Sequence, residues 1–114
     1  MPPAKTTLLQ GTLDLIVLQL LQAEPTNGYD LTQRIQAISR DVLNVNAGSL
    51  YPALYRLEKK GWIDAEWGAS EKNRRAKYYR LTSDGERELR EGRRVWSGFA
   101  QAVGQVLAAR ERPA

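Results

Sequence analysis

Aliphatic residues recur at helical spacing in three successive segments within the first 60 residues of this chain. Inside each segment they are three or four residues apart, which places them on one face of a helix. The three sets are Leu9, Leu13, Ile16 and Leu20; then Leu31, Ile35 and Ile38; and finally Leu50, Leu54 and Leu57. The sequence therefore predicts amphipathic helices at residues 8–23, 28–39 and 49–60.

Helix-breaking residues mark where these predicted helices begin and end. Pro25 biases the residue before it away from helical geometry, and Gly28 tolerates a turn, so the first helix should end near Ala23. The stretch "DVLNV" is expected to be a short extended piece that precedes a turn at Gly48. Gly61 should then stop the third helix, because glycine is the preferred residue just past a helix end.

Pro52 lies inside the third apolar repeat, where a proline normally disrupts a helix. The first four N–H groups of a helix have no internal partner, so a proline in the first turn forfeits no backbone bond. If Ser49 is the N-cap, Pro52 is the third helical residue, and the Ser49 hydroxyl accepts a bond typically worth about 1 kcal/mol. A helix that started at Asn46 would instead bend locally at the proline.

A β-hairpin is predicted after the third helix. Ile63, Ala65 and Trp67 alternate with acidic residues, which gives a strand one apolar and one polar face. The polar and basic stretch "GASEKNRRAK" follows, and then "YYRLT", which is rich in strand formers. We therefore expect two strands joined by a long, exposed and charged loop.

The segment after Thr82 predicts one long terminal helix, since glycines are its only breakers and acids gather in its first turns, where they suit the helix dipole. Its apolar positions alternate steps of three and four residues, in a seam that a small domain could not cover alone. The seam residues are Leu89, Gly92, Trp96, Phe99, Val103 and Val106. We expect a homodimer whose interface contains Leu89, Trp96, Phe99, Val103 and Val106.

Charge is distributed unevenly along the chain. The formal net charge is +4, yet charges cancel over residues 1–57. Five cations fall within residues 72–80 without an acid among them, a density that attracts a polyanion. The alternative is an ordinary solvated loop.

The chain contains neither cysteine nor histidine. This removes disulfides, the common zinc sites, thiolate nucleophiles and the usual proton shuttle at neutral pH. Asp64 and Glu66 are two residues apart on a predicted strand, where they form a solvent-facing pair, and no phosphate-cradling glycine loop is present. We expect no enzymatic activity, no metal and no other cofactor.

The apolar N-terminal stretch does not predict a signal peptide or membrane helix, because polar residues recur on one side of it. These residues are Gln10, Thr12, Asp14, Gln19 and Gln22. The absence of cysteine also fits a reducing compartment. We therefore expect a cytoplasmic protein that does not enter a membrane.

Three helices followed by a hairpin with basic residues at its tip are the element order of a winged helix-turn-helix. The predicted fold class is mainly α with a small β-hairpin: a DNA-binding domain at residues 1–82, then a dimerisation helix at residues 83–114. The third helix buries its leucines, so its other side is expected to present Tyr51, Tyr55, Arg56 and Lys59 to solvent. Such side chains suit phosphates and base edges.

Several motifs in this order resemble the PadR family of bacterial transcriptional regulators. They are "LLQGTLDLIVLQLL", "NGYDLTQRI", "AGSLYPALYRLEKKGWI" and "NRRAKYYRLTSDGEREL". The resemblance covers residues 8 to about 90, and the single terminal helix resembles the smaller subgroup of the family. This chain has Ser49 where the family usually has Thr, and Asn73-Arg74-Arg75-Ala76 where the family's wing usually has a Gly-Arg-Pro type of tip.

The resemblance implies a homodimeric repressor that binds double-stranded operator DNA of two-fold symmetry. Some relatives bind planar aromatic compounds between the subunits through a tryptophan of the last helix, and Trp96 lies in the matching segment. A flat ring can stack on an aromatic effector. The alternative for Trp96 is a plain core position of the dimer seam.

The predicted DNA contacts come from the third helix and the hairpin. They are Ser49, Tyr51, Tyr55, Arg56, Lys59, Lys72, Arg74, Arg75 and Lys77. Tyr51 and Tyr55 could instead pack against a neighbouring helix, and the hairpin cations could serve solubility alone. A different class of function also fits the fold, namely a protein-interaction module that does not bind DNA.

Overall fold

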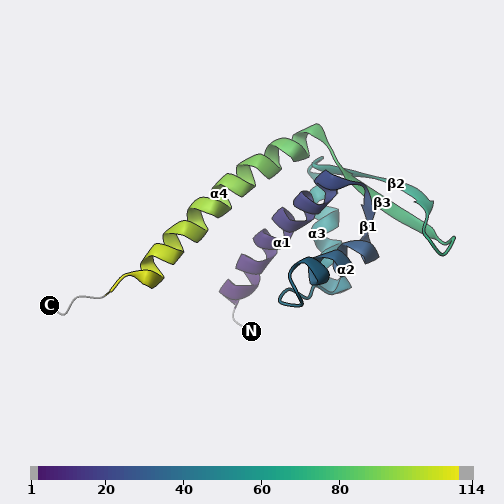
Figure 1. Ribbon diagram of the computed structural model, residues 1–114. Coiled ribbons are helices and arrows are strands. Elements are labelled where there is room, and N and C mark those ends of the chain that lie inside the picture. The colour runs from purple at the N-terminus through teal and green to yellow at the C-terminus, as the bar shows by residue number, and fades with distance from the viewer. Residues whose placement is uncertain (1–2, 111–114) are drawn as a thin grey trace.

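The three predicted helices, the hairpin and the terminal helix all form, in the predicted order (Figure 1). The computed structural model describes residues 3–110, with side chains described from residue 11 onward. The elements are α1 (Pro3–Ala23), β1 (Thr26–Asn27), α2 (Gly28–Ile38), α3 (Ala47–Lys59), β2 (Ile63–Ala69), β3 (Arg75–Leu81) and α4 (Ser83–Ala108). The side chain of the predicted apolar residue Leu9 and the outermost residues of both predicted domains lie outside what is described.

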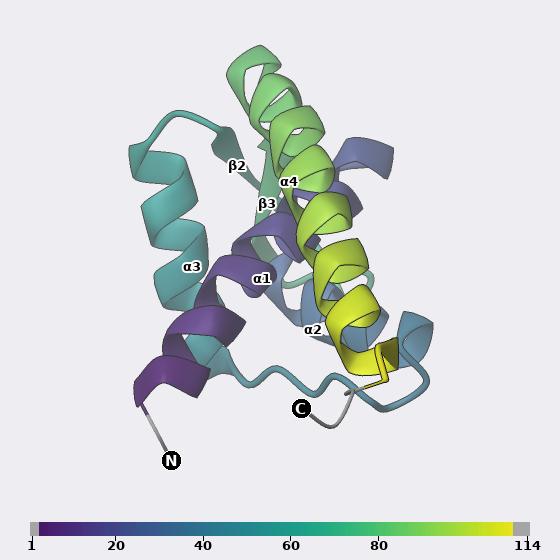
Figure 2. The same ribbon diagram turned by 90° about the vertical axis from the view of Figure 1, so that its left-hand side faces the viewer.

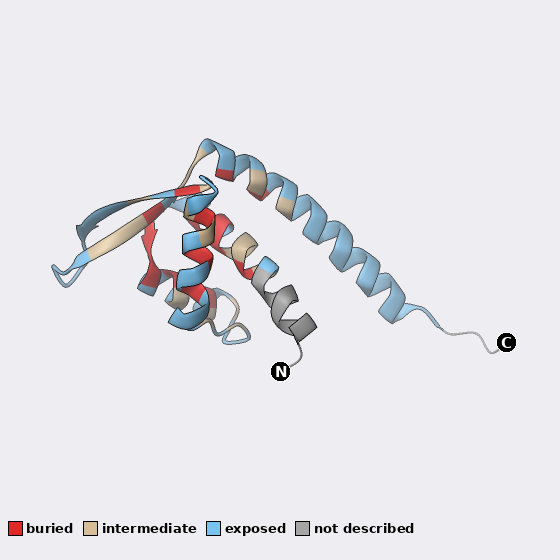
Figure 3. Cartoon of the chain, turned by 180° about the vertical axis from the view of Figure 1, so that it is seen from behind, coloured by how far each residue is buried: buried red, intermediate tan, exposed pale blue. Residues whose placement is uncertain are grey.

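One hydrophobic core joins the four helices to β2 and β3, and leucines form most of it (Figure 3). Its buried members are Leu13, Val17, Leu18, Leu20, Leu21, Leu31, Ile35, Leu50, Ala53, Leu54, Leu57, Ile63, Tyr79 and Leu89. Of the predicted apolar residues before the terminal helix, Ile16 and Ala65 are partly buried against this core, and two others are exposed. Ile38 is at the end of α2, and Trp67 is on β2 beyond the edge of the core, and both are exposed. Periodicity thus identified the buried faces but not where along each element the core ends.

The start of α3 corrects the predicted N-cap. Asn46, not Ser49, caps the helix, and its Oδ1 accepts from the backbone N–H of Ser49 at 3.0 Å. The helix therefore begins at Ala47, which makes Pro52 its sixth residue. Pro52 cannot donate to the carbonyl of Gly48, so the helix forgoes one internal backbone hydrogen bond at this point. Both residues are exposed, so water can reach that carbonyl.

The segment between α2 and α3 also differs from prediction. Residues 39–42 form a turn that includes the first two residues of the expected extended piece, and residues 43–46 have no regular secondary structure. Arg40 and Asp41 both adopt positive φ angles, of 53° and 67°, and the Asp41 N–H donates to the carbonyl of Gln36 at 2.9 Å. Two successive left-handed residues reverse the chain direction, which the composition of "DVLNV" does not indicate.

Gly61 ends α3 as predicted. It has a φ of 79°, and its N–H donates to Glu58 while the N–H of Trp62 donates to Leu57. This pair of bonds is a Schellman motif, which satisfies the last carbonyls of the helix. The Trp62 carbonyl then accepts from the N–H of Thr82 at 3.1 Å, which joins the end of the hairpin to the end of α3.

The sheet has three antiparallel strands in the order β1-β3-β2, one more than the predicted hairpin. The additional strand, β1, has only two residues, and it pairs Thr26 with Tyr79. The hairpin strands are also longer than expected, since Ala69 pairs with Arg75 and the connecting loop is confined to residues 70–74. We call β2, β3 and this loop the wing.

Helix α4 packs against α1 over its first turns and then extends beyond the core (Figures 1 and 2). Thr82 caps it, and its Oγ1 accepts from the N–H of Gly85 at 3.0 Å. Leu89 is buried against the core, whereas residues 93–108 are exposed. No helix among residues 3–110 is both long and apolar enough to cross a bilayer.

Candidate nucleic-acid interface

The side of α3 opposite the core is polar, aromatic and accessible. Leu50, Leu54 and Leu57 are fully buried, whereas Tyr51 is 49% and Tyr55 is 65% exposed. Ser49 and Lys59 are exposed as well, and the Lys59 ammonium lies 5.7 Å from the centroid of the Tyr55 ring. The helix therefore offers hydroxyl groups and a cation to a partner on its outer side.

The wing carries the remaining predicted cations. Arg75 stacks on Trp67, with 4.4 Å between its guanidinium carbon and the ring centroid. This contact gives the exposed Trp67 a partner and restrains the arginine. Lys72 and Arg74 lie in the exposed loop, where the Ser70 hydroxyl accepts from the backbone N–H of Arg74 at 3.2 Å. The wing thus holds its charge beyond the body of the protein.

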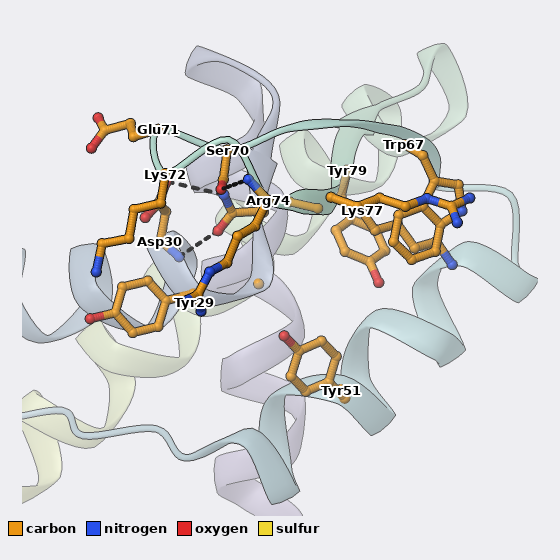
Figure 4. Close-up of a pocket in the computed structure, with 14 residues that line it drawn as sticks. Tyr29, Asp30, Tyr51, Trp67, Ser70, Glu71, Lys72, Arg74, Lys77 and Tyr79 are labelled. Atoms are coloured by element: carbon orange, nitrogen blue, oxygen red, sulfur yellow. Dashed lines mark hydrogen bonds between the residues drawn. The ribbon is translucent and has the colours of Figure 1, made fainter.

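A cleft of about 640 Å³ lies between the wing, α3 and the start of α2. Five of the predicted DNA contacts line it, namely Tyr51, Lys72, Arg74, Arg75 and Lys77. Figure 4 shows Lys72 and Arg74 directed toward Tyr29 at the start of α2, whereas Lys77 lies near Trp67. Ser49, Tyr55, Arg56 and Lys59 are not part of the cleft lining in the described chain and lie elsewhere on α3.

Tyr29 is a candidate contact that the sequence reasoning missed. It lines the same cleft from the first turn of α2 and is 69% exposed. The only sequence signal is an aromatic residue two positions after the Asn27 cap, off the apolar face of α2. The position of Tyr29 in the sequence does not indicate that the wing lies across the cleft from it.

Tyr51 sits directly above the start of α2. A Cβ built on Gly28 would lie 2.6 Å from the Tyr51 hydroxyl oxygen, so glycine is what allows this approach. Tyr79 on β3 is a buried member of the core. Burial raises the pKa of its phenol, an effect that the nearby charge of Lys77 partly opposes. The phenol of Tyr79 therefore stays protonated at neutral pH and belongs to the packing between sheet and helices.

Two predicted DNA contacts are paired with acids of the same chain. The Arg56 guanidinium Nη2 lies 2.9 Å from Oδ1 of Asp14 on α1. The Lys77 ammonium lies 3.3 Å from Oε1 of Glu58 on α3. Both pairs are partly exposed, so their cations remain accessible from the protein surface.

A second depression, of about 590 Å³, lies between α1 and α4. Its walls are mainly apolar and aromatic, with Trp96 and Phe99 on α4 facing Leu15 and Leu18 on α1. The two rings are 6.2 Å apart between centroids and about half exposed. We call this depression the α1–α4 groove.

The predicted dimer seam divides into two parts. Leu89 is 1% exposed and belongs to the core of its own chain. Trp96, Phe99, Val103 and Val106 are exposed on the part of α4 that extends beyond the core.

In residues 11–110, no cluster of three or more acids could hold a metal ion.

Comparisons with known proteins agree on one family. The model of the transcriptional regulator PadR-like family matches residues 17–91. A PadR-like transcription factor from Bacteroides fragilis is 31% identical, with a TM-score of 0.75 over 92% of this chain and 99% of that one. A PadR family regulator from Eggerthella lenta is 33% identical, with a TM-score of 0.74 over 94% of this chain and 92% of that one.

Two further relatives are similar over most of their length. A transcriptional regulator from Clostridium thermocellum is 27% identical, with a TM-score of 0.79 over 87% of this chain and 96% of that one. An uncharacterised protein from Lysinibacillus sphaericus is 32% identical over 99 residues, which cover 87% of this chain and 91% of the relative.

Proposed function

The chain belongs to the PadR-like family of transcriptional regulators, and from this premise we propose that it is a homodimeric repressor of a palindromic operator. Members of this family are DNA-binding regulators and not enzymes, and the winged helix-turn-helix fold agrees with that class. The repressor role, the operator symmetry and the residue assignments that follow are part of the proposal, as is a cytoplasmic location.

In this proposal α3 enters the major groove, and Ser49, Tyr51, Tyr55, Arg56 and Lys59 contact bases and phosphates. The wing cations Lys72, Arg74, Arg75 and Lys77 neutralise phosphates of the adjacent backbone. The observation that carries the proposal is the cleft in which α3, the wing and Tyr29 combine exposed phenols with cations. Duplex phosphates carry the charge that complements this surface.

Dimerisation is assigned to residues 83–114, through the exposed seam of α4. A second copy of α4 laid into the α1–α4 groove would cover Trp96 and Phe99, which a single chain leaves about half exposed. Contiguous apolar surface of this kind usually marks an interface. A planar aromatic effector bound beside Trp96 would change how the subunits pair, and so would release the operator.

A gel-shift titration tests the function. The duplex should be the promoter next to the protein's own gene, with a scrambled duplex of the same length and composition as the control. We expect the promoter duplex to bind more tightly at physiological salt and both duplexes to bind at low salt. Failure of every duplex to bind at low ionic strength would contradict DNA binding and favour the protein-interaction alternative.

A further inference from the structure

Two acidic side chains lie next to cations of the proposed DNA-binding surface, where a negative charge opposes binding. Each is paired with a cation that we assign to phosphate contact: Asp14 with Arg56 at 2.9 Å, and Glu58 with Lys77 at 3.3 Å. The side chains of Asp14 and Glu58 are 20% and 38% exposed, and Asp14 also lines the α1–α4 groove. Both carboxylates lie within ion-pair distance of a proposed DNA contact, so their charges act on a polyanion bound there. An acid in this position would repel DNA phosphates, so its presence needs a physical explanation.

Helical geometry places the two pairs on opposite flanks of the outer side of α3. Arg56 and Glu58 are two positions apart, which separates them by roughly 160° around the helix axis. Tyr55 and Lys59, both exposed, lie in the arc between them. One pair links α3 to α1 and the other links α3 to the wing. The outer side of α3 is thus bordered by an ion pair on each side.

These pairs oppose sequence-independent binding. Duplex DNA carries one negative charge per ~1.7 Å of its axis, and attraction to phosphates supplies essentially all of non-specific binding. Each carboxylate reduces the positive potential that this mode needs. Each carboxylate also fixes its cation in one direction, and phosphate contacts made from fixed positions set the register of the protein on the duplex. The acids therefore weaken non-specific binding more than specific binding.

We propose that Asp14 and Glu58 are specificity-determining residues, which hold Arg56 and Lys77 in place and penalise duplexes that lack the matching contacts. Discrimination between partners is a difference of affinities, and repulsion of the wrong partner is one way to achieve it. The inference rests on the proposed DNA-binding function. It concerns how tightly wrong sequences bind, not whether the operator binds.

The test compares Asp14→Asn, Glu58→Gln and the double variant with the parent protein on two duplexes, the bound promoter fragment and its scrambled counterpart. We expect each single variant to bind the scrambled duplex about threefold more tightly, with a salt slope steeper by about 0.9 for each cation that becomes free to pair with phosphate. Operator affinity should rise less or fall. The ratio of the two affinities should drop about tenfold in the double variant.

Glu86→Gln is the matched control. It removes one negative charge from the exposed first turn of α4, which lies at the end of β3 opposite the wing loop. The control should change both duplex affinities by the same small factor and leave their ratio intact. Because both duplexes are titrated with one preparation, a partly unfolded variant alters both affinities equally and does not affect the ratio.

The outcomes separate the two claims. If the operator binds and the ratio of affinities stays unchanged in the double variant, the inference is wrong and the regulator function stands. The ratio could instead drop only because operator binding is lost, with scrambled-duplex affinity unchanged. Asp14 and Glu58 would then only position their cations, and the proposed repulsion of non-matching duplexes would be wrong. Failure of both duplexes to bind at low salt would overturn the regulator function and this inference together.

Discussion

The hydroxyl of Tyr51 on α3 lies 2.6 Å from where a Cβ on Gly28 at the start of α2 would be. Real Cβ atoms essentially never approach another heavy atom so closely. The Tyr51 ring therefore occupies this position over the start of α2 because residue 28 has no side chain. This contact joins a backbone position in one helix to a proposed DNA contact in another.

Gly28→Ala should displace the Tyr51 ring and weaken operator binding about tenfold. Tyr51 is half exposed, so its ring can move aside, and the free energy of unfolding should fall by only about 1 kcal/mol. Affinity is measured by fluorescence anisotropy with a labelled operator, and stability by urea unfolding.

A double-mutant cycle provides the control for this first prediction. If Gly28→Ala acts through the tyrosine, it should have no further effect on DNA affinity in a Tyr51→Ala background. Additive losses of affinity in the cycle would show that the two residues act independently.

The wing cations should determine the salt dependence of binding. Arg74→Ala and Arg75→Ala together should lower the slope of log K against log salt by about 1.8, since each lost phosphate contact removes about 0.9. Arg87→Ala on α4 is the matched control, because Arg87 pairs with Asp84 away from the wing. A slope that stays unchanged in the wing variant would exclude the wing from phosphate contact.

Gly85→Ala should destabilise the fold by about 3 kcal/mol, because the new methyl group would lie 2.0 Å from the Trp62 carbonyl oxygen. That carbonyl is backbone and cannot rotate away. The free energy of unfolding is obtained from urea titration. Gly98→Ala on the same helix meets no atom within 4 Å, so it should leave stability equal or raise it by up to about 1 kcal/mol. Equal effects at both glycines would refute the close packing at residue 85.

The exposed seam of α4 should hold the dimer together. Trp96→Glu or Phe99→Glu should give monomers by light scattering, since a buried unpaired charge would be placed in the interface. Gln101→Glu adds the same charge on the opposite side of the helix and should leave the mass unchanged. A dimer mass in both seam variants would mean that the subunits pair elsewhere.

Much of the proposed interface was accessible from sequence because it depends on local pattern. The leucines at positions 50, 54 and 57 define the buried side of α3, so the tyrosines between them had to be exposed. Gly61 was identified as the helix stop because a left-handed residue there satisfies the last carbonyls. The wing strands were found from their alternation, although the loop between them is shorter than the polar composition suggested.

Other features could not be read from local pattern. Asn46 and Ser49 are both favourable N-cap residues. Which of them caps α3 depends on where the preceding turn ends and the helix begins. Strand β1 has two residues and exists only because β3 offers an edge to pair with. Leu89 belongs to the same apolar repeat as Trp96, yet only the docking of α4 on α1 separates a core residue from an exposed one.

By itself, the sequence determined the order of elements, the buried face of each helix and the basic character of the wing, because periodicity and composition act through neighbouring residues. The tertiary structure alone decided which distant side chains meet. Asp14 and Arg56 are 42 positions apart, and Tyr29 faces the wing across a cleft that no local pattern encodes. Such contacts arise from how elements pack, and that is fixed by the shape and volume of the whole core.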